Sequence, residues 1–222
     1  MLDYNFNFSV IWRNADEFLT GLGLGLGMAL ISLLIGSVIG LLCAYGRTSR
    51  FAPLRILIWL YVEFVRNTPL LLLIFFVYFG LPEFGIFVFD KVESFILTLA
   101  LYAGAYMTEI FRAGLNSIPK QYVEAAMAIG LTPIKRQTKV VLPVMFRITL
   151  PSLSNTLISL FKDTSLAAAI AVPELTFIAR QVNTNTFRVI EAWLTASVLY
   201  LAAAYTIAIA LRRLERRYAA IR

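Results

Sequence analysis

Residues 21–46 read "GLGLGLGMALISLLIGSVIGLLCAYG", and this uninterrupted apolar run decides the class of the fold. The run contains no charged residue, and a helix of about 20 apolar residues is long enough to cross the hydrocarbon core of a bilayer. A β-hairpin is excluded, because lone strands in lipid leave their backbone polar groups unpaired. The sequence therefore predicts a transmembrane helix at this position.

The composition of the whole chain indicates the same class. Hydrophobic residues make up 59% of the 222 residues, and the mean hydropathy is +0.77, which is more apolar than a soluble domain of this size. Because there is no histidine and only one cysteine, Cys43, we expect neither imidazole chemistry, nor an internal disulfide, nor a metal site. In a membrane protein the net charge of +7 indicates basic cytoplasmic loops rather than a nucleic-acid partner.

Four further apolar segments are long enough to cross a bilayer. We place these spans near residues 55–80, 94–115, 148–171 and 190–211. The expected fold is therefore an all-α integral membrane protein with five transmembrane helices, in which residues 1–222 form a single transmembrane domain.

The distribution of lysine and arginine predicts how the helices are oriented, because basic residues are enriched in cytoplasmic loops. If the N-terminus lies outside, 14 of the 20 basic residues are cytoplasmic, two lie within spans and only four lie on the outer side. The four outer residues are Arg13, Lys91, Arg180 and Arg188. We therefore predict an external N-terminus and a cytoplasmic C-terminus.

Glycines of the first span recur four residues apart. The pairs are Gly21/Gly25, Gly23/Gly27 and Gly36/Gly40. Such spacing places small residues on one helix face and allows a neighbouring helix to approach closely. We interpret the pairs as packing surfaces, and a gating hinge is the alternative.

The segment 117–143, "SIPKQYVEAAMAIGLTPIKRQTKVVLP", is the longest loop between two predicted spans and lies on the cytoplasmic side in this orientation. Its pattern predicts a first short helix that is capped by Ser117, has Pro119 in its opening turn and stops at Gly130.

A second short helix follows in the same loop. It begins with Thr132 as cap and Pro133 at the first helical position, and Pro143 ends it. By pattern alone the two helices are either amphipathic connectors on the lipid surface, with lysines that meet anionic headgroups, or a docking site for a cytoplasmic partner.

A family resemblance distinguishes these two interpretations. The loop carries, in order, Glu124, Ala125, Ala126, Gly130, Leu142 and Pro143. This pattern resembles the EAA signature of ABC-importer permease subunits. The resemblance implies that the loop is a coupling element, whose short helix sits in a cleft of a separate ATP-binding subunit.

Three other stretches resemble the polar amino-acid permeases within that family. They are "YVEFVRNTPLLLLIFFVYFGLP" (61–82), "YMTEIFRAGLNSIPKQYVEAA" (106–126) and "FKDTSLAAAI" (161–170). The resemblance implies a multi-pass protein of the bacterial cytoplasmic (inner) membrane. Its expected partners are two ATP-binding subunits, a second permease chain, identical or homologous, and a periplasmic or surface-tethered amino-acid-binding protein.

The chain has no G-x-x-x-x-G-K-[ST] segment that would cradle the phosphates of ATP. We therefore expect a non-catalytic subunit without a cofactor of its own, and we assign ATP and Mg²⁺ to the partner ATP-binding subunits.

Charged residues inside two predicted spans are the candidates for the substrate path, since a charge at mid-membrane costs about 2.5–3.5 kcal/mol. Glu63 and Arg66, three residues apart, can pair on the second span, and Lys162 and Asp163 lie near the centre of the fourth. They either hold helices together as buried ion pairs or line the path. The path interpretation includes eight residues: Glu63, Arg66, Asn67, Thr68, Lys162, Asp163, Thr164 and Ser165.

Thr68 and Pro69 predict a break in the second span, because the residue before a proline avoids the α-helical region. Thr68 can then cap a new helix whose free N–H groups attract a carboxylate. Our hypothesis is that Arg66, Asn67 and Thr68 meet the substrate α-carboxylate and Asp163 meets its ammonium group. A simple proline kink is the alternative.

Two other functions were considered. In an ion-gradient-driven secondary transporter, Asp163 and Glu63 would be ion sites, but the number of spans is small and no internal repeat is visible. An intramembrane enzyme is disfavoured by the absence of histidine and of a paired acidic metal motif. The mixed charges at the candidate path allow an acidic, amidic or basic amino acid as substrate.

Overall fold

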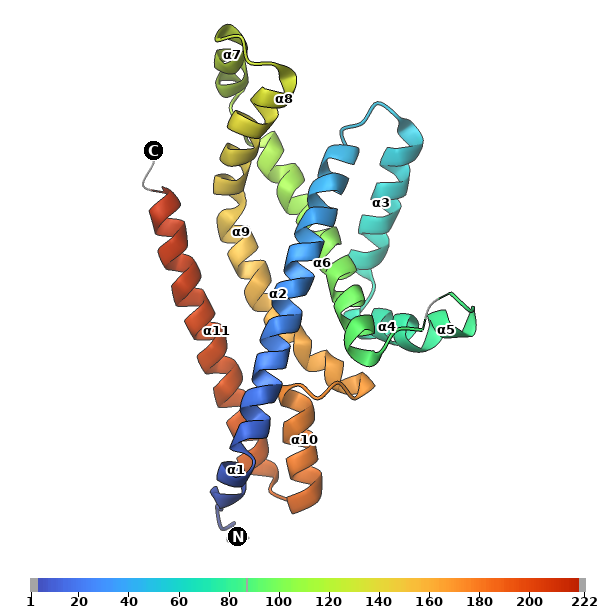
Figure 1. Cartoon of the computed structure of the whole chain (residues 1–222), viewed down its shortest axis with the longest axis vertical. Helices are drawn as coiled ribbons and strands as arrows, with labels where there is room; N and C mark the ends of the chain where they lie inside the picture. The colour runs from blue at the N-terminus through green and yellow to red at the C-terminus, as the bar shows by residue number, and fades with distance from the viewer. Residues whose placement is uncertain (1–3, 87, 220–222) are drawn as a thin grey trace.

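The computed structural model describes residues 4–86 and 88–219, and every regular element in that part is a helix. Four long helices run along the molecule: α2 (Ala15–Gly46), α6 (Lys91–Asn116), α9 (Leu142–Asp163) and α11 (Val189–Ala219). The N-terminal end of α2 lies at one extremity, and α7 (Lys120–Ala128) lies at the other (Figure 1).

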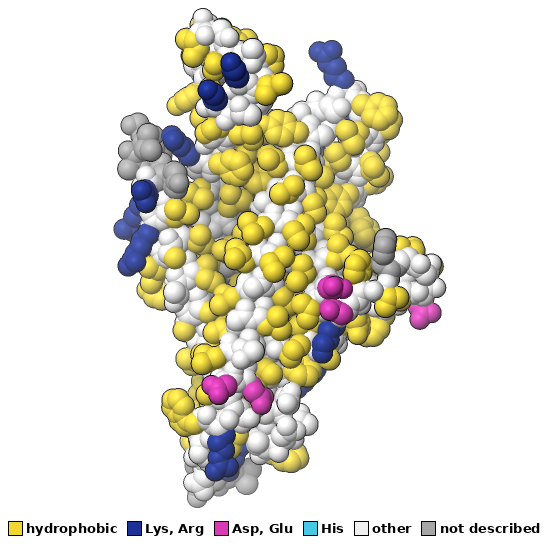
Figure 2. Space-filling view, in the orientation of Figure 1, with side chains coloured by type: hydrophobic (Ala, Val, Ile, Leu, Met, Phe, Trp, Pro, Cys, Tyr) yellow, Lys and Arg dark blue, Asp and Glu magenta, His cyan; other side chains and the backbone are white. Residues whose placement is uncertain are grey.

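Four helical stretches are long and apolar enough to span a membrane. They are Ala15–Gly46, Lys91–Asn116, Pro133–Ile170 and Val189–Arg217. A fifth, Ala52–Asn67 followed by Leu70–Glu83, is bent by 110° at its break, so the spans number five only if this pair is one span. Hydrophobic side chains cover the middle of the visible face, and lysines and arginines lie mainly along its rim and at its two ends (Figure 2).

The predicted second span is thus two helices rather than one. Helix α3 (Ala52–Asn67) ends before Thr68, and α4 (Leu70–Phe75) runs across the long axis of the molecule (Figure 1). Leu70 and Ile74 of α4 are buried in a core cluster with Phe95 and Leu99 of α6. Burial of this apolar face holds the transverse helix against α6.

Two of the three glycine pairs on α2 are packing surfaces. A Cβ added at Gly36 would lie 2.6 Å from the Cβ of Ala103, and one at Gly40 would lie 2.3 Å from the Cβ of Met107. Helix α6 therefore approaches α2 more closely than any side chain would allow. At the other end, Gly21 faces the backbone of Glu174 in the same way.

Gly23 and Gly27 behave differently from this packing face. A Cβ at either position would meet nothing within 4 Å. The prediction of close packing is therefore confirmed for the two pairs that face α6, α10 (Leu175–Thr186) and Thr164. It is not confirmed for Gly23 and Gly27.

Pro143 does not end a helix, which corrects one prediction. Helix α8 (Pro133–Arg136) continues through a π-helical turn, η2 (Gln137–Val141), into α9. Proline lacks an N–H and clashes with the carbonyl four residues earlier, so a wider turn relieves both problems. The same solution occurs at Pro82, which follows the π-helical turn η1 (Phe76–Gly80) and starts the short helix α5 (Leu81–Glu83).

The segment between the last two spans, expected as a loop, contains α10. Glu174, which is fully buried, caps this helix by accepting hydrogen bonds from the backbone N–H groups of Thr176 and Phe177, both at 2.9 Å. The hydroxyl of Tyr200 on α11 donates to the same carboxylate at 2.6 Å. Helix α10 is thereby fastened to both α2 and α11.

Candidate coupling and translocation sites

Helix α7 begins later than its sequence predicts. Pro119 is its N-cap, and the hydroxyl of Ser117 donates to the carbonyl of Ala113 at 2.7 Å, so Ser117 serves the end of α6 instead. Only three residues separate α6 from α7, and this short connection leaves Ser117 within reach of the last turn of α6.

The end of α7 agrees with the prediction. Gly130 has a φ of +75°, and its N–H donates to Met127 while the N–H of Leu131 donates to Ala126. This pair of bonds is the Schellman motif, which favours glycine at the left-handed position. Thr132 accepts a 3.4 Å hydrogen bond from the N–H of Lys135 and begins α8, as expected.

The residues of the EAA pattern divide between two faces of α7. Ala126 is buried, whereas Glu124 and Ala125 are exposed. The exposed side also presents apolar groups, since Ile129 and Ile134 are 76% and 77% exposed. Ala126 therefore packs against the rest of the molecule. Ala125, Ile129 and Ile134 give α7 and the start of α8 a partly apolar exposed surface.

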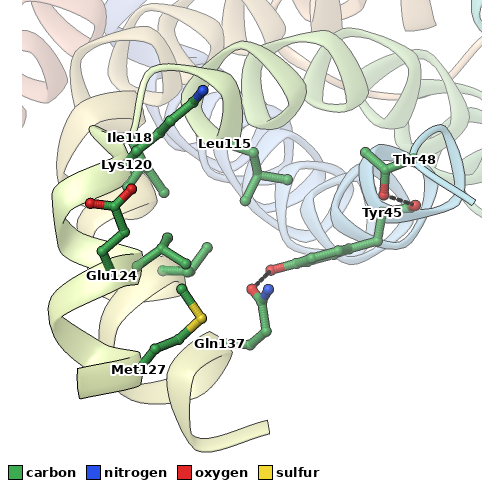
Figure 3. A pocket seen from close by; sticks show the side chains of 10 residues that line it. Tyr45, Thr48, Leu115, Ile118, Lys120, Glu124, Met127 and Gln137 are labelled. Carbon is green, nitrogen blue, oxygen red and sulfur yellow. Dashed lines mark hydrogen bonds between the residues drawn. The ribbon is translucent and has the colours of Figure 1, made fainter. Parts of the chain in front are cut away.

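A pocket of about 450 Å³ lies behind α7, against the ends of α2 and α6. Glu124 and Met127 line it from α7, and Tyr45 lines it from α2 (Figure 3). The hydroxyl of Tyr45 donates to the Gln137 side chain of η2 at 3.0 Å (Figure 3). The pocket thus separates part of α7 from the ends of α2 and α6.

Glu63 and Arg66 do not form the ion pair that their spacing allowed. The amide of Asn67 donates to the carboxylate of Glu63 at 3.1 Å. The guanidinium of Arg66 lies over the ring of Tyr106 instead, 5.3 Å from its centroid. Tyr106, on α6, supplies a π-face that partly offsets the loss of water around this cation.

The break at Thr68 and Pro69 is present, but Thr68 does not cap the new helix. Its hydroxyl donates to the carbonyl of Phe64 at 2.7 Å and so satisfies the end of α3. Leu70, the first residue of α4, is buried in the core. Arg66, rather than the start of α4, is therefore the group available to a carboxylate.

The four candidates on the fourth span occupy different environments. Lys162 is exposed, and Asp163 and Ser165 are half-buried. Thr164 is fully buried, donates to the carbonyl of Phe161 at 2.6 Å and faces Gly25 of α2. Thr164 therefore packs α2 against η3 (Thr164–Ile170), and its role on the path stays a prediction.

Sequence reasoning missed Tyr102 and Tyr106. Their hydroxyls share a 3.1 Å hydrogen bond, and Tyr102 lies close enough to both Arg66 and Asp163 to interact electrostatically with each. The two tyrosines thus connect the cation of α3 with the carboxylate of α9. Two aromatic hydroxyls at i and i+4 on one span were the signal that could have revealed them.

A second pocket extends from this cluster along α6 and α9. It has a volume of about 330 Å³ and is lined by Arg66, Tyr106 and Glu109, with Thr149 and Ser152 on the facing helix. Glu109 accepts hydrogen bonds from Arg112 at 2.9 and 2.5 Å. The pocket therefore joins mid-helix charged groups to the end of the molecule that carries α7.

Comparison with known proteins identifies the family. Residues 36–220 match the family described as the inner membrane component of binding-protein-dependent transport systems. The chain belongs to this family. Within it, this permease is similar to amino-acid ABC transporter permeases along nearly its whole length.

Three relatives illustrate this similarity. The probable amino-acid ABC transporter permease YckA of Bacillus subtilis is 34% identical, covering 98% of this permease and 96% of YckA. The glutamine permease GlnP of Escherichia coli K12 is 35% identical over 96% and 97% of the two chains. The histidine/lysine/arginine/ornithine permease HisM of Salmonella typhimurium is 33% identical over 95% and 93%.

Solved structures have the same fold. An amino-acid ABC transporter crystallised with histidines matches with a TM-score of 0.88 and 28% identity, covering 96% of this permease and all of that chain. The inward-facing MetNI methionine transporter matches with a TM-score of 0.75 at 22% identity, covering 96% and 99%. These likenesses give no support to an ion-gradient transporter, and Glu63, one of its two expected ion sites, is exposed and bonded to Asn67.

Proposed function

We propose that this permease is the membrane subunit of an ATP-driven importer of a polar amino acid. Its partners are two ATP-binding subunits, a second permease chain and an external amino-acid-binding protein, all at the bacterial cytoplasmic membrane. The observation that carries the proposal is α7: a short helix with Glu124 and Ala125 exposed, ended sharply at Gly130, in a member of a binding-protein-dependent transport family.

Coupling in this proposal depends on how α7 is attached. Because α7 contacts the rest of the chain chiefly through η2 and α8, a force on its exposed tip is transmitted to α9, which continues directly from η2. ATP and Mg²⁺ belong to the partner subunits and supply that force. The permease itself changes the population of inward-open and outward-open states and does no chemistry.

The substrate path in this proposal runs past Arg66 and Asp163. Arg66 offers a cation for the α-carboxylate, and Asp163 offers a carboxylate for the ammonium group, with Tyr102 and Tyr106 between them. In this proposal three neighbouring residues, Glu63, Asn67 and Thr68, do not touch the substrate. Asn67 is bonded to Glu63, and Thr68 is bonded to the end of α3.

Gly130 provides the sharpest test of coupling. An alanine there must adopt a left-handed conformation that costs about 1–2 kcal/mol, which loosens the end of α7. Gly130→Ala should therefore reduce substrate-stimulated ATP hydrolysis and co-purification of the ATP-binding subunit, both measured on the detergent-solubilised complex.

Gly85 supplies a matched control. It also has a positive φ, +65°, and its added Cβ, like that at Gly130, would meet nothing within 4 Å. Gly85→Ala imposes the same backbone strain far from α7 and should leave association with the ATP-binding subunit unchanged. Equal effects of the two substitutions on association would contradict the assignment of α7 as the coupling element.

A further inference from the structure

An open pocket of about 440 Å³ lies where α2 ends, α3 begins and α6 ends. Three arginines from these three places line it: Arg47, Arg55 and Arg112. Trp59 and Ile56 of α3 form an apolar wall beside them. The ends of α2 and α6 and the start of α3 lie at the same end of the molecule as α7 (Figure 1). Of the residues that line the pocket, only Thr48 also lines the pocket behind α7, and none lines the pocket along α6 and α9.

Among the described residues, the carboxylate of Glu109 is bonded to Arg112 and also interacts electrostatically with Arg47, so the three arginines share one negative charge. Arg112 is bonded to Glu109, so its charge is largely neutralised. Arg55 donates only to the backbone carbonyl of Ser49, at 3.2 Å, and neither Arg55 nor Arg47 takes part in an ion pair in the part of the chain that the structure describes. The pocket therefore favours an anion.

The pocket also lies at the boundary of a membrane span. The candidate span of α2 ends at Gly46, so Arg47 is the first residue beyond it. Three apolar side chains of α3 are about half exposed here: Ile56 at 56%, Trp59 at 46% and its neighbour Leu60 at 52%. Tryptophan is enriched at such boundaries, where its ring sits at headgroup level.

We propose that this pocket binds the phosphate of an anionic phospholipid. Arg47 and Arg55 hold the phosphate oxygens through charge-assisted hydrogen bonds, and an acyl chain lies along the exposed apolar side of α3. The apolar wall favours a lipid over a free phosphate ion, which would leave Trp59 and Ile56 uncovered. Basic pockets between helices at the membrane surface bind anionic headgroups in this way.

The bound lipid would connect α3 with α6 at the base of the coupling loop, since Asn116, the last residue of α6, also lines the pocket. The lipid site itself depends only on the membrane insertion of α2 and α3. It is therefore tested by lipid binding to the purified full-length chain, without any ATP-binding subunit, and its failure is distinguishable from failure of the proposed transport function.

The experiment compares retention of phosphatidylglycerol and phosphatidylcholine by native mass spectrometry of the full-length chain. Wild type should retain phosphatidylglycerol preferentially. The double substitution Arg47→Gln/Arg55→Gln should weaken that retention by roughly 25-fold, given a contribution near fivefold from each basic residue. The charge-retaining pair Arg47→Lys/Arg55→Lys should keep most of it, which separates loss of charge from loss of folding.

Arg212→Gln/Arg213→Gln on α11 is the matched control, because it removes two exposed charges outside the pocket. The proposal fails if this control loses phosphatidylglycerol as strongly as the pocket variant, or if the pocket variant retains it like wild type. It also fails if inorganic phosphate displaces phosphatidylglycerol from the wild-type chain, since the source of the phosphate would then be soluble rather than lipid.

Discussion

Arg66 is the residue at which the structure most changes the interpretation of the sequence. Its spacing from Glu63 suggests an ion pair, yet its guanidinium lies over Tyr106, and Glu63 accepts from Asn67. Because the side chain is exposed and lines a pocket, it remains free to pair with an incoming carboxylate. The tyrosine ring holds the cation in place without neutralising it.

Arg66→Ala should therefore raise the KM for the transported amino acid by roughly tenfold or more, the value of one hydrogen bond to a charged group. The maximal rate of ATP hydrolysis should change less. Tyr106→Phe keeps the ring beneath Arg66 and removes only the hydroxyl that bonds Tyr102, so its KM should rise less. Uptake into proteoliposomes measures the KM, and phosphate release by the same vesicles measures ATP hydrolysis. An unchanged KM in Arg66→Ala would remove Arg66 from the path.

At the same scale, Gly40 and Gly27 give a paired test of helix packing. Gly40→Ala forces a Cβ to 2.3 Å from that of Met107, and overpacking of this kind costs about 1–3 kcal/mol. Gly27→Ala meets open space and should be neutral or slightly stabilising. Thermal unfolding in detergent should show a lowered Tm for the first variant only, and a similar loss in both would contradict the α2–α6 contact.

At the scale of elements, local signals predict the start or end of a helix where one residue type satisfies one backbone need. Gly130 ends α7 because only glycine adopts its φ at low cost, and Thr132 begins α8 because its hydroxyl accepts a free N–H. The Thr68–Pro69 break follows from the same kind of rule.

Elements that depend on tertiary contacts could not be predicted in this way. Ser117 donates to the Ala113 carbonyl of α6 and does not accept an N–H group of α7, because α7 begins only after Pro119. The π-helical turns before Pro82 and Pro143 keep the chain helical where a local rule predicts a stop. Helix α10 depends on Glu174, whose burial and bond to Tyr200 bring together distant parts of the chain.

The residues of the candidate sites differ in the same way: some are predicted from one segment of sequence, and others depend on tertiary contacts. The EAA pattern marks the proposed coupling loop because its residues all lie within one segment, 124–143. The groups around Arg66 come from α3, α6 and α9, so their meeting depends on packing that no single segment encodes. The spacing of Tyr102 and Tyr106 indicates only that they are neighbours on one helix. The packing of α6 against α3 and α9 brings them close to Arg66 and Asp163.

At the scale of the whole molecule, the N-terminal segment is fastened to the start of α11. The hydroxyl of Tyr4 and the backbone N–H of Asn7 both donate to the carboxylate of Glu191. The hydrogen bond to Glu191 raises the pKa of Tyr4, because it stabilises the neutral phenol that donates. Arg188 completes the contact by donating to the carbonyl of Asn5 at 2.8 Å.

This contact gathers the N-terminus, α10 and the start of α11 at one extremity, opposite α7 (Figure 1). The predicted orientation places the first extremity outside and α7 in the cytoplasm. Two exposed residues report on the two sides: Asn185 at the end of α10 and Ile129 at the end of α7. Single cysteines at these positions, in a chain whose native Cys43 is replaced by alanine, should differ in their accessibility.

A membrane-impermeant maleimide should label Asn185→Cys in spheroplasts and Ile129→Cys only in inside-out vesicles. Permeabilised membranes, in which both cysteines should react, control for burial of either side chain. The prediction follows from the basic residues near α7 and in the C-terminal part of α11, which are held on the cytoplasmic side of bacterial membranes. Labelling of Ile129→Cys in spheroplasts would put α7 out of reach of any cytoplasmic ATP-binding subunit and end the coupling proposal.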